Sequence, residues 1–314
     1  MAERIMKEIY YRKSNPSGYG GMYDLFHAVR KKKPNVTISQ IKKFLAKQDT
    51  YTLNRPVITR FKKRKTLAKR VDYLWQLDLV SMQALSRYNN GVSYLLCVID
   101  VLSRYAFVEP IKKKTGENVV KALRKIIRNS KRICEKAMTD RGSEFYNSVF
   151  KRFMNEKNII HYSSFSDYKC AIVERFNKTI QSRLYKAMSR ENTSAYLKFI
   201  PEVTEAYNKR KHRAHNHRPI DVNKQNEKKI WRILYSDYFK TPIKDPKFKE
   251  GDLVRLAKKK EVFSRSYHSQ WTDEVFVVNS IKRTIPITYE IRDQNNEILS
   301  GSFYEAELNL VLKD

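Results

Sequence analysis

The chain has 314 residues, of which 41% are hydrophobic and 12% aromatic, so it is globular and large enough for more than one core. Its 64 Lys and Arg outnumber its 33 Asp and Glu, which gives a net charge of +31. Because such an excess of positive charge repels itself unless a polyanion is near, nucleic acid is the partner that the composition favours. The charge is densest in residues 1–70, where 19 Lys and Arg stand against 4 acidic residues.

The sequence holds no apolar run of about 18 residues, and its start lacks the apolar stretch of a secretory signal. We therefore expect no membrane partner and an intracellular location, in the nucleus if DNA is the partner. The three cysteines, Cys97, Cys134 and Cys170, are odd in number and far apart. This spacing fits neither a disulfide framework nor a zinc-binding pair, so we expect small core residues.

The first 70 residues divide into three parts. Residues 1–15 are basic and show no hydrophobic period, which predicts a flexible basic tail. Residues 16–60 carry two amphipathic helical patterns separated by a proline, which predicts a helix-turn-helix-like module. A helical hairpin that only packs on a neighbour fits this pattern equally well. Residues 61–70 form a basic linker, whose candidates for contact with DNA phosphates are Lys62, Lys63, Arg64 and Lys65.

From residue 71 the hydrophobic pattern changes to strands and helices in the order β-β-β-α-β-α-β-α. This order predicts an α/β fold over residues 71–222, a ribonuclease-H-like core with a mixed five-stranded sheet and flanking helices. Residues 223–245 are typical of a linker with one short helix. The short alternating strands of residues 246–314 predict an SH3-like or chromo-like β-barrel.

Three acidic residues stand at the ends of apolar elements. Asp78 lies in the first strand, Asp140 follows the fourth strand, and Glu174 lies in the first turn of a long helix. Carboxylates crowded into one pocket repel each other unless cations neutralise them, and Mg²⁺ suits such hard oxygen ligands. Two ions roughly 4 Å apart would clamp the oxygens of an in-line displacement at phosphorus. The pattern therefore predicts a metal site for phosphoryl chemistry, although each acid alone is better explained as a turn or cap residue.

The sequence around these acids resembles a known family. The resemblance rests on Thr-Asp-Arg-Gly-Ser-Glu-Phe at 139–145, on Val-Glu-Arg-Phe-Asn-Lys-Thr at 173–179, and on the stretches 75–80, 94–105, 248–255 and 301–305. Over nearly its whole length the chain is similar to the D,D-E integrases of retroviruses and long-terminal-repeat elements. It is most similar to the retroviral-like integrases of Maverick/Polinton DNA transposons.

The resemblance implies a DNA integrase, a polynucleotidyl transferase that trims the 3′ ends of transposon DNA and joins them to target DNA. It implies that Asp78, Asp140 and Glu174 are the catalytic acids and the ligands of Mg²⁺, for which Mn²⁺ can substitute. The implied partners are transposon-end DNA, target DNA and further copies of the chain in a dimer or tetramer. Contact with chromatin through the C-terminal barrel is a further expectation.

Polar residues near the glutamate are candidates for contact with the DNA end. Lys178 follows Glu174 by one helical turn on the same face, beside Gln181. Lys169 in the preceding loop is a further candidate. A solvated surface side chain is the alternative for each lysine.

Two more acids lie close to the strands in sequence. Asp100 ends the second strand, where we expect it to accept hydrogen bonds, and Asp72 precedes the first strand, where we expect it to be solvated. Neither is expected to bind metal.

One departure from the family concerns zinc. Retroviral integrases carry an N-terminal His and Cys zinc module, whereas residues 1–70 hold a single histidine, His27, and no cysteine, so no structural zinc is expected. The remaining metal-like spacing belongs to His212, His215 and His217, which have no cysteine or acid beside them. Two other functions remain open: a catalytically idle relic that binds DNA or chromatin, and a magnesium-dependent nuclease of the same fold.

Overall fold

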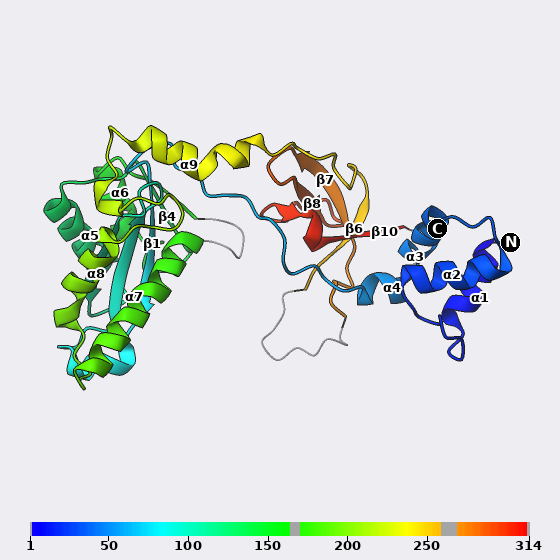
Figure 1. Ribbon diagram of the computed structural model, residues 1–314, viewed down its shortest axis with the longest axis horizontal. Coiled ribbons are helices and arrows are strands. Elements are labelled where there is room, and N and C mark those ends of the chain that lie inside the picture. The colour runs from blue at the N-terminus through cyan, green and yellow to red at the C-terminus, as the bar shows by residue number, and fades with distance from the viewer. Residues whose placement is uncertain (1, 164–169, 259–268, 313–314) are drawn as a thin grey trace. The chain divides into compact units, whose positions relative to one another are not determined.

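The computed structural model describes residues 2–163, 170–258 and 269–312. The chain divides into two compact units (Figure 1). We call Lys65–Thr241 the core unit, and Met1–Arg64 together with Pro242–Asp314 the terminal unit. Among the residues that the structure describes, no helix combines the length and the apolar character needed to cross a membrane.

The core unit contains a mixed sheet of five strands in the order β3-β2-β1-β4-β5. An antiparallel meander comes first, followed by two strands that run parallel to the first strand. The strands are β1 (Leu74–Ser81), β2 (Tyr94–Asp100), β3 (Ala106–Ile111), β4 (Lys136–Thr139) and β5 (Ile160–Ser163). This is the sheet that the sequence pattern predicts, and the ribonuclease-H-like core is confirmed.

Helices cover both faces of this sheet. They are α5 (Gly116–Ser130), α6 (Ser148–Glu156), α7 (Ala171–Arg190), α8 (Ile200–Lys209) and α9 (Glu227–Lys240), with short 3-10 turns η1 (Gln83–Tyr88), η2 (Leu197–Phe199) and η3 (Pro219–Asp221). Figure 1 shows α5 and α7 on opposite sides of β1. Because side chains alternate along a strand, Trp75 and Leu77 pack with α5 and α6, whereas Leu74 and Val80 pack with α7 and α8. The side chain of Asp78 therefore faces α7.

Helix α9 differs from the expected linker with a short helix at 223–245. Ile230 and Leu234 follow each other at i, i+4 and are buried in the core that contains α7 and α8. The hydroxyl of Tyr235 accepts a hydrogen bond from the backbone N–H of Ala68 at 3.3 Å. The apolar face of the helix thus finds its partner inside the core unit, so this segment packs as part of that unit.

The terminal unit contains an antiparallel five-stranded sheet in the order β10-β6-β7-β8-β9. Its strands are β6 (Leu253–Leu256), β7 (Phe276–Lys282), β8 (Thr288–Arg292), β9 (Phe303–Tyr304) and β10 (Leu308–Val311), with a 3-10 turn η4 (Glu305–Glu307) before the last strand. Phe248, Val254, Tyr289 and Ile291 form its core. The sheet agrees with the small barrel-like domain that the alternating pattern predicts.

Four helices complete the terminal unit: α1 (Ala2–Tyr11), α2 (Met22–Lys32), α3 (Ile38–Ala46) and α4 (Asp49–Asn54). A capping box begins α3, since the Thr37 hydroxyl accepts from the Gln40 backbone N–H and the Gln40 side chain accepts from the Thr37 backbone N–H. The expectation of a flexible tail at 1–15 is wrong. Helix α1 buries Met6, Ile9 and Tyr10 against α2 and α3, an apolar stripe that the surrounding charges obscured.

Helix α4 is tied to the barrel-like sheet by buried polar groups. The guanidinium of Arg255 on β6 donates to the Asp49 carboxylate at 2.6 Å and to the backbone oxygens of Thr272 and Asp273 at 2.8 and 2.6 Å. The Asn309 side chain on β10 donates to the Thr52 backbone oxygen at 2.8 Å. Because buried polar groups need partners, these bonds make α4 a structural part of the β-sheet domain.

Packing of α1 can be tested with Ile9→Ala, which removes a buried side chain while raising helix propensity. We expect a loss of about 2–4 kcal/mol in the free energy of unfolding of the terminal unit. Lys7→Ala changes an exposed position of the same helix and should shift stability by less than about 0.5 kcal/mol. Urea unfolding followed by circular dichroism measures both, and equal small effects would show that α1 is not packed.

Candidate active site

The pairing of β1 with β4 sets the positions of two acids. The strands are parallel and in constant register, with Leu74 opposite Lys136 and Gln76 opposite Met138. Continuing this register by two residues brings Asp78 level with Asp140, just beyond the end of β4. Neighbouring strands lie about 4.8 Å apart, so the backbones of the two residues run side by side, and the charge of Asp140 acts on the Asp78 carboxyl.

The side chain of Gln76 fixes the start of α7 against β1. Its amide oxygen accepts hydrogen bonds from the backbone N–H groups of Ile172 and Val173, both at 3.1 Å. The residue at the N-cap of α7, Cys170, makes no side-chain cap bond of its own. Gln76 is fully buried and thus satisfies two N–H groups that a helix start leaves without partners. The first turn of α7, which carries Glu174, is held beside the strand of Asp78.

A second amide links the helix to the strand. The Asn177 side chain donates to the Asp78 carboxylate at 2.8 Å, and the other Asp78 oxygen accepts from the Leu79 N–H at 2.8 Å. Asn177 follows Glu174 by three residues and is buried. The sequence analysis did not predict this role of Asn177. Its position three residues after Glu174, on the same face of the helix, was the feature that could have indicated it.

Negative charge collects around Asp78. The pKa of Asp78 is raised to about 6, mainly by burial; the charges of Asp140, Glu174 and Glu144 also raise it, while the Leu79 N–H lowers it. Among the described residues, no Lys, Arg or His forms an ion pair with Asp78, Asp140 or Glu174. An all-carboxylate set that lacks a protein cation is the donor chemistry that suits Mg²⁺.

The side chains are not arranged as a finished metal cage. In the ranges 2–163, 170–258 and 269–312, no three His, Cys, Asp or Glu are gathered closely enough to hold a metal ion. Asp78 is bonded to Asn177, and one Asp140 oxygen accepts from the Gly142 N–H at 3.0 Å. Because like charges repel, the carboxylates are held by these donors instead of converging. Magnesium binding at the three acids therefore stays a prediction.

The predicted DNA-contacting residues on α7 have the expected exposure. Lys178 is exposed and Gln181 is half-buried, and both follow the exposed Glu174 along one face of the helix. Lys169 lies outside the described residues. Whether Lys178 and Gln181 touch DNA stays a prediction.

The basic linker is more structured than a solvated run. The Lys65 ammonium donates to the backbone oxygen of Leu234 at 3.0 Å and lies over the ring of Tyr238. In the terminal unit, the Lys63 ammonium lies over the ring of Phe61, and the backbone N–H of Arg64 donates to the Tyr304 hydroxyl at 3.0 Å. Lys62 is exposed. Part of this charge is therefore bound to the fold.

The three histidines after α8 are held by backbone groups. His215 is fully buried, and its Nε2 lies 3.1 Å from the Ser103 backbone oxygen. The backbone N–H of His217 donates to the His215 Nδ1 at 3.2 Å. Burial lowers the pKa of both His212 and His215 to about 4, so both are neutral at physiological pH. These contacts explain the histidines as structural residues of a tight loop.

The two acids beside the strands are structural. Asp100 is fully buried and accepts hydrogen bonds from the backbone N–H and the hydroxyl of Ser103, as expected. The expectation that Asp72 is solvated is wrong. Its carboxylate accepts from the Arg132 guanidinium at 2.7 Å and from the Trp75 indole at 2.8 Å. The sequence separation of Arg132 hid this pair, which the end of α5 brings next to β1.

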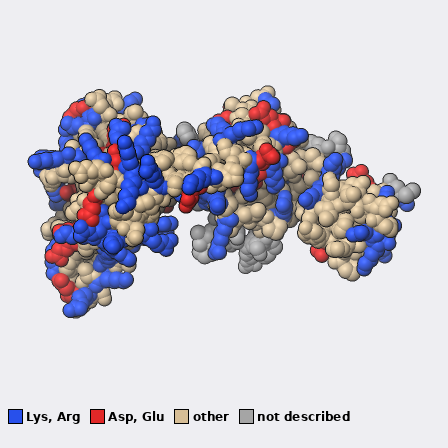
Figure 2. Space-filling view, turned by 45° about the horizontal axis from the view of Figure 1, so that its top comes forward, with Lys and Arg blue, Asp and Glu red and all other residues tan. Residues whose placement is uncertain are grey.

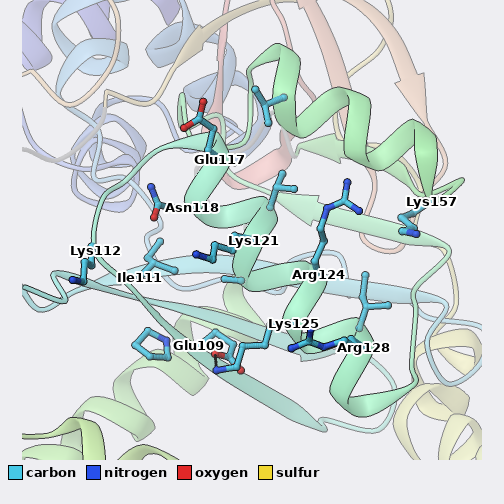
Figure 3. Close-up of a pocket in the computed structure, with 15 residues that line it drawn as sticks. Glu109, Ile111, Lys112, Glu117, Asn118, Lys121, Arg124, Lys125, Arg128 and Lys157 are labelled. Carbon is cyan, nitrogen blue, oxygen red and sulfur yellow. Dashed lines mark hydrogen bonds and ion pairs between the residues drawn. The ribbon is translucent and has the colours of Figure 1, made fainter. Parts of the chain in front are cut away.

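A separate groove of about 1060 Å³ lies between β3 and α5 (Figure 3). Basic side chains predominate along it, and two acids, Glu109 and Glu117, interrupt them. Lys125 pairs with Glu109 at 2.7 Å, and Arg124 pairs with Glu156 at 2.6 Å. None of the three predicted catalytic acids lines this groove. Figure 2 shows that Lys and Arg also spread over the visible surface of the core unit outside any single patch.

The mixed sheet, with acids in β1, after β4 and in the first turn of α7, defines a ribonuclease-H-like core of the integrase type. The integrase core domain family matches residues 68–165. A transposon-derived protein of Caenorhabditis elegans is 34% identical over 203 residues, which cover 62% of this chain and 67% of that protein. The chain therefore belongs to the family of transposon-derived proteins with a retroviral-like integrase core.

Two more distant relatives agree with this assignment. The retrovirus-related Pol polyprotein from transposon 297 of Drosophila melanogaster is 28% identical over 157 residues, which make up 46% of this chain but only 15% of the polyprotein. A chain of the simian T-cell lymphotropic virus intasome, solved in complex with the PP2A regulatory subunit B56 gamma, has a TM-score of 0.62 and 14% identity. This match covers 94% of the present chain and 96% of the viral one, and it shows a common fold.

The role of Gln76 can be tested by comparing Gln76→Leu with Gln181→Leu, the same change at a half-buried position of α7. Gln76→Leu leaves two N–H groups at the start of α7 without partners, so we expect a loss of about 1–3 kcal/mol in unfolding free energy. Gln181→Leu should change it by less than about 0.5 kcal/mol. Urea denaturation measures both, and equal stabilities would exclude the capping role.

The charge at Asp78 predicts a pH-dependent gain for Asp78→Asn in a chelating buffer. Because folding raises the pKa of this carboxyl, its penalty to the fold grows as pH rises above the unfolded value and is complete above the folded value of about 6. At pH 7.5 we expect the variant to be more stable than the parent by about 1–3 kcal/mol. Near pH 4 the two should differ little. Thermal unfolding at both pH values measures this, and no gain at pH 7.5 would contradict the buried charge.

Proposed function

We propose that this chain is a DNA integrase that processes the 3′ ends of transposon DNA and joins them to target DNA. The observation that carries the proposal is the shared register of β1 and β4, combined with the Gln76 bonds to α7. Together they bring the three separate elements that carry Asp78, Asp140 and Glu174 next to one another, which supports a common site. Membership of the transposon-derived family with an integrase core supports the same reading.

Asp78, Asp140 and Glu174 would hold two Mg²⁺ ions, or Mn²⁺ in their place. When bound, these ions would supply the charge that stabilises the attacking and leaving oxygens at phosphorus. Asn177 orients the Asp78 carboxylate through its 2.8 Å hydrogen bond. Gln76 keeps the start of the helix that carries Glu174 against β1, so the segments that carry the acids are positioned before any ligand arrives.

DNA is the substrate that the surface charge favours. The net charge of +31 predicts strong, salt-sensitive and largely sequence-independent binding to phosphates. Lys178 and Gln181 extend from the α7 face of Glu174 and would contact the element's end. The cations of residues 62–65 would also contact DNA phosphates.

The wider setting is also part of the proposal. Joining two DNA ends to one target requires more than one active site, so the working form would be a dimer or tetramer. The intasome fold match supports such an assembly. The sequence motifs favour an element of the Maverick/Polinton type, a nuclear location, and chromatin contact through the barrel-like domain.

The proposal is tested by a strand-transfer assay with the full chain, Mg²⁺ and oligonucleotides that mimic candidate element ends. We expect joined products that Asp140→Asn reduces by at least about a hundredfold, because even groups that only support metal ligands typically contribute 10–100-fold. Asp237→Asn, at an exposed position of α9, is the matched control and should retain activity.

Other outcomes would point elsewhere. Cleavage of nucleic acid without joining would favour a magnesium-dependent nuclease. Tight DNA binding with neither reaction would favour a relic of a transposon that has lost catalysis. Equal activity of Asp140→Asn and the parent would remove Asp140 from the site.

A further inference from the structure

A buried ion pair lies beside the three acids. Glu144 follows Asp140 by four residues, and its side chain is only 2% exposed. One carboxylate oxygen lies 3.1 Å from the ammonium of Lys114, whereas the other is buried and has no hydrogen-bond partner among the described groups. A buried carboxylate is unfavourable unless a cation compensates it. Glu144 therefore holds Lys114 strongly in this position.

The backbone at Gly142 and at Gly116 lies very close to side chains of the segment 144–147, which leaves no room for a larger residue at either glycine. A side chain at Gly142 would place its Cβ 2.5 Å from both Glu144 carboxylate oxygens, and one at Gly116 would place its Cβ 2.2 Å from the Asn147 side-chain oxygen. The Asn147 side chain donates to the Glu144 backbone oxygen at 2.9 Å and caps α6. The loop before α5 and the loop after Asp140 are thus packed tightly against each other.

The pair lies within electrostatic reach of the predicted catalytic acids. The hydrogen bond to Glu144 raises the pKa of Lys114, and the charge of Asp140 raises it further. The charge of Glu144 is also one of those that raise the pKa of Asp78. The Lys114 ammonium therefore lies within electrostatic range of Asp140, although it pairs with none of the three acids.

The Lys114 ammonium has N–H donors that Glu144 does not use. Its side chain is 47% exposed, and an ammonium has three N–H donors, of which Glu144 takes one. A cation in this position faces solvent at the edge of the acid cluster. A phosphate that approaches the acids would therefore meet it.

We propose that Lys114 binds a phosphate of the DNA at the active site, and that Glu144 is the positioning residue that holds it there. This inference rests on the proposed function for the identity of the substrate. It distinguishes Lys114 from the adjacent exposed Lys113, which has no ion pair among the described residues. The run Lys112–Lys114 thus contains one ordered cation and two solvated ones.

The test is DNA binding by the full chain without divalent cations, so that no reaction occurs. The probe is a short fluorescein-labelled duplex with a frayed end, and anisotropy is measured over a range of salt concentrations. Loss of one phosphate contact should reduce the slope of log K against log salt by about 1 and weaken binding about fivefold at physiological salt. We expect this of Lys114→Met and a smaller change of Lys113→Met. Equal changes in the two variants would overturn the proposal.

The variant Glu144→Gln tests whether Glu144 acts by holding Lys114 in place or only through its own negative charge. If Glu144 acted only through its charge, removing a negative group near DNA would strengthen binding. A positioning role predicts weaker binding, and it predicts that Lys114→Met adds little in the Glu144→Gln background. Tighter binding by Glu144→Gln would overturn the proposal.

If Glu144→Gln fails to fold, the double variant Lys114→Glu/Glu144→Lys, which exchanges the two residues, takes its place. It keeps an ion pair but places the cation in the buried position, so it should bind DNA no better than Lys114→Met. Parental affinity in the exchanged variant would contradict the assignment. The outcome is independent of catalysis: absent joined products would refute the integrase activity, whereas unchanged DNA binding by Lys114→Met would refute only the role of Lys114.

Discussion

The concentration of negative charge on one face of β1 is the constraint on which the core unit depends. Burial, together with the charges of neighbouring carboxylates, raises the pKa of Asp78 to about 6. The fold tolerates this charge because uncharged donors surround it: the Asn177 amide, the Leu79 N–H and, for Asp140, the Gly142 N–H. Hydrogen bonds to neutral donors hold the carboxylates without cancelling their charge.

In both units, buried polar side chains fix helices against strands. Gln76 joins a helix start to a strand, and Arg255 joins α4 to the barrel-like sheet. Each bond links segments far apart in sequence. Because an unsatisfied buried group costs more than a hydrogen bond gains, such links select one arrangement of the elements instead of simply adding stability. The Lys114–Glu144 pair follows the same logic beside the acids.

The sequence predicted most of the core. Strand and helix periods gave the β-β-β-α-β-α-β-α order, because apolar side chains recur at 2.0 and 3.6 residues whatever their eventual partners. Prediction failed at α1, where Ile9 lies in a short stripe among charges. For α9 it gave the helix but not its packing, because only the facing surface shows that Ile230 is buried. It failed at Asp72 for a related reason, since Arg132 is distant in sequence and adjacent in space.

For the candidate site, the sequence by itself determined which three acids to consider, because their strand-end and helix-start positions and the motifs around them are local features. Only the tertiary structure decided that Gln76 anchors α7, that Asn177 holds Asp78, and that Glu144 is buried against Lys114. These relations depend on the register of β1 with β4 and on how closely two loops approach. Register and loop approach follow from the packing of the whole core, and no single segment encodes them.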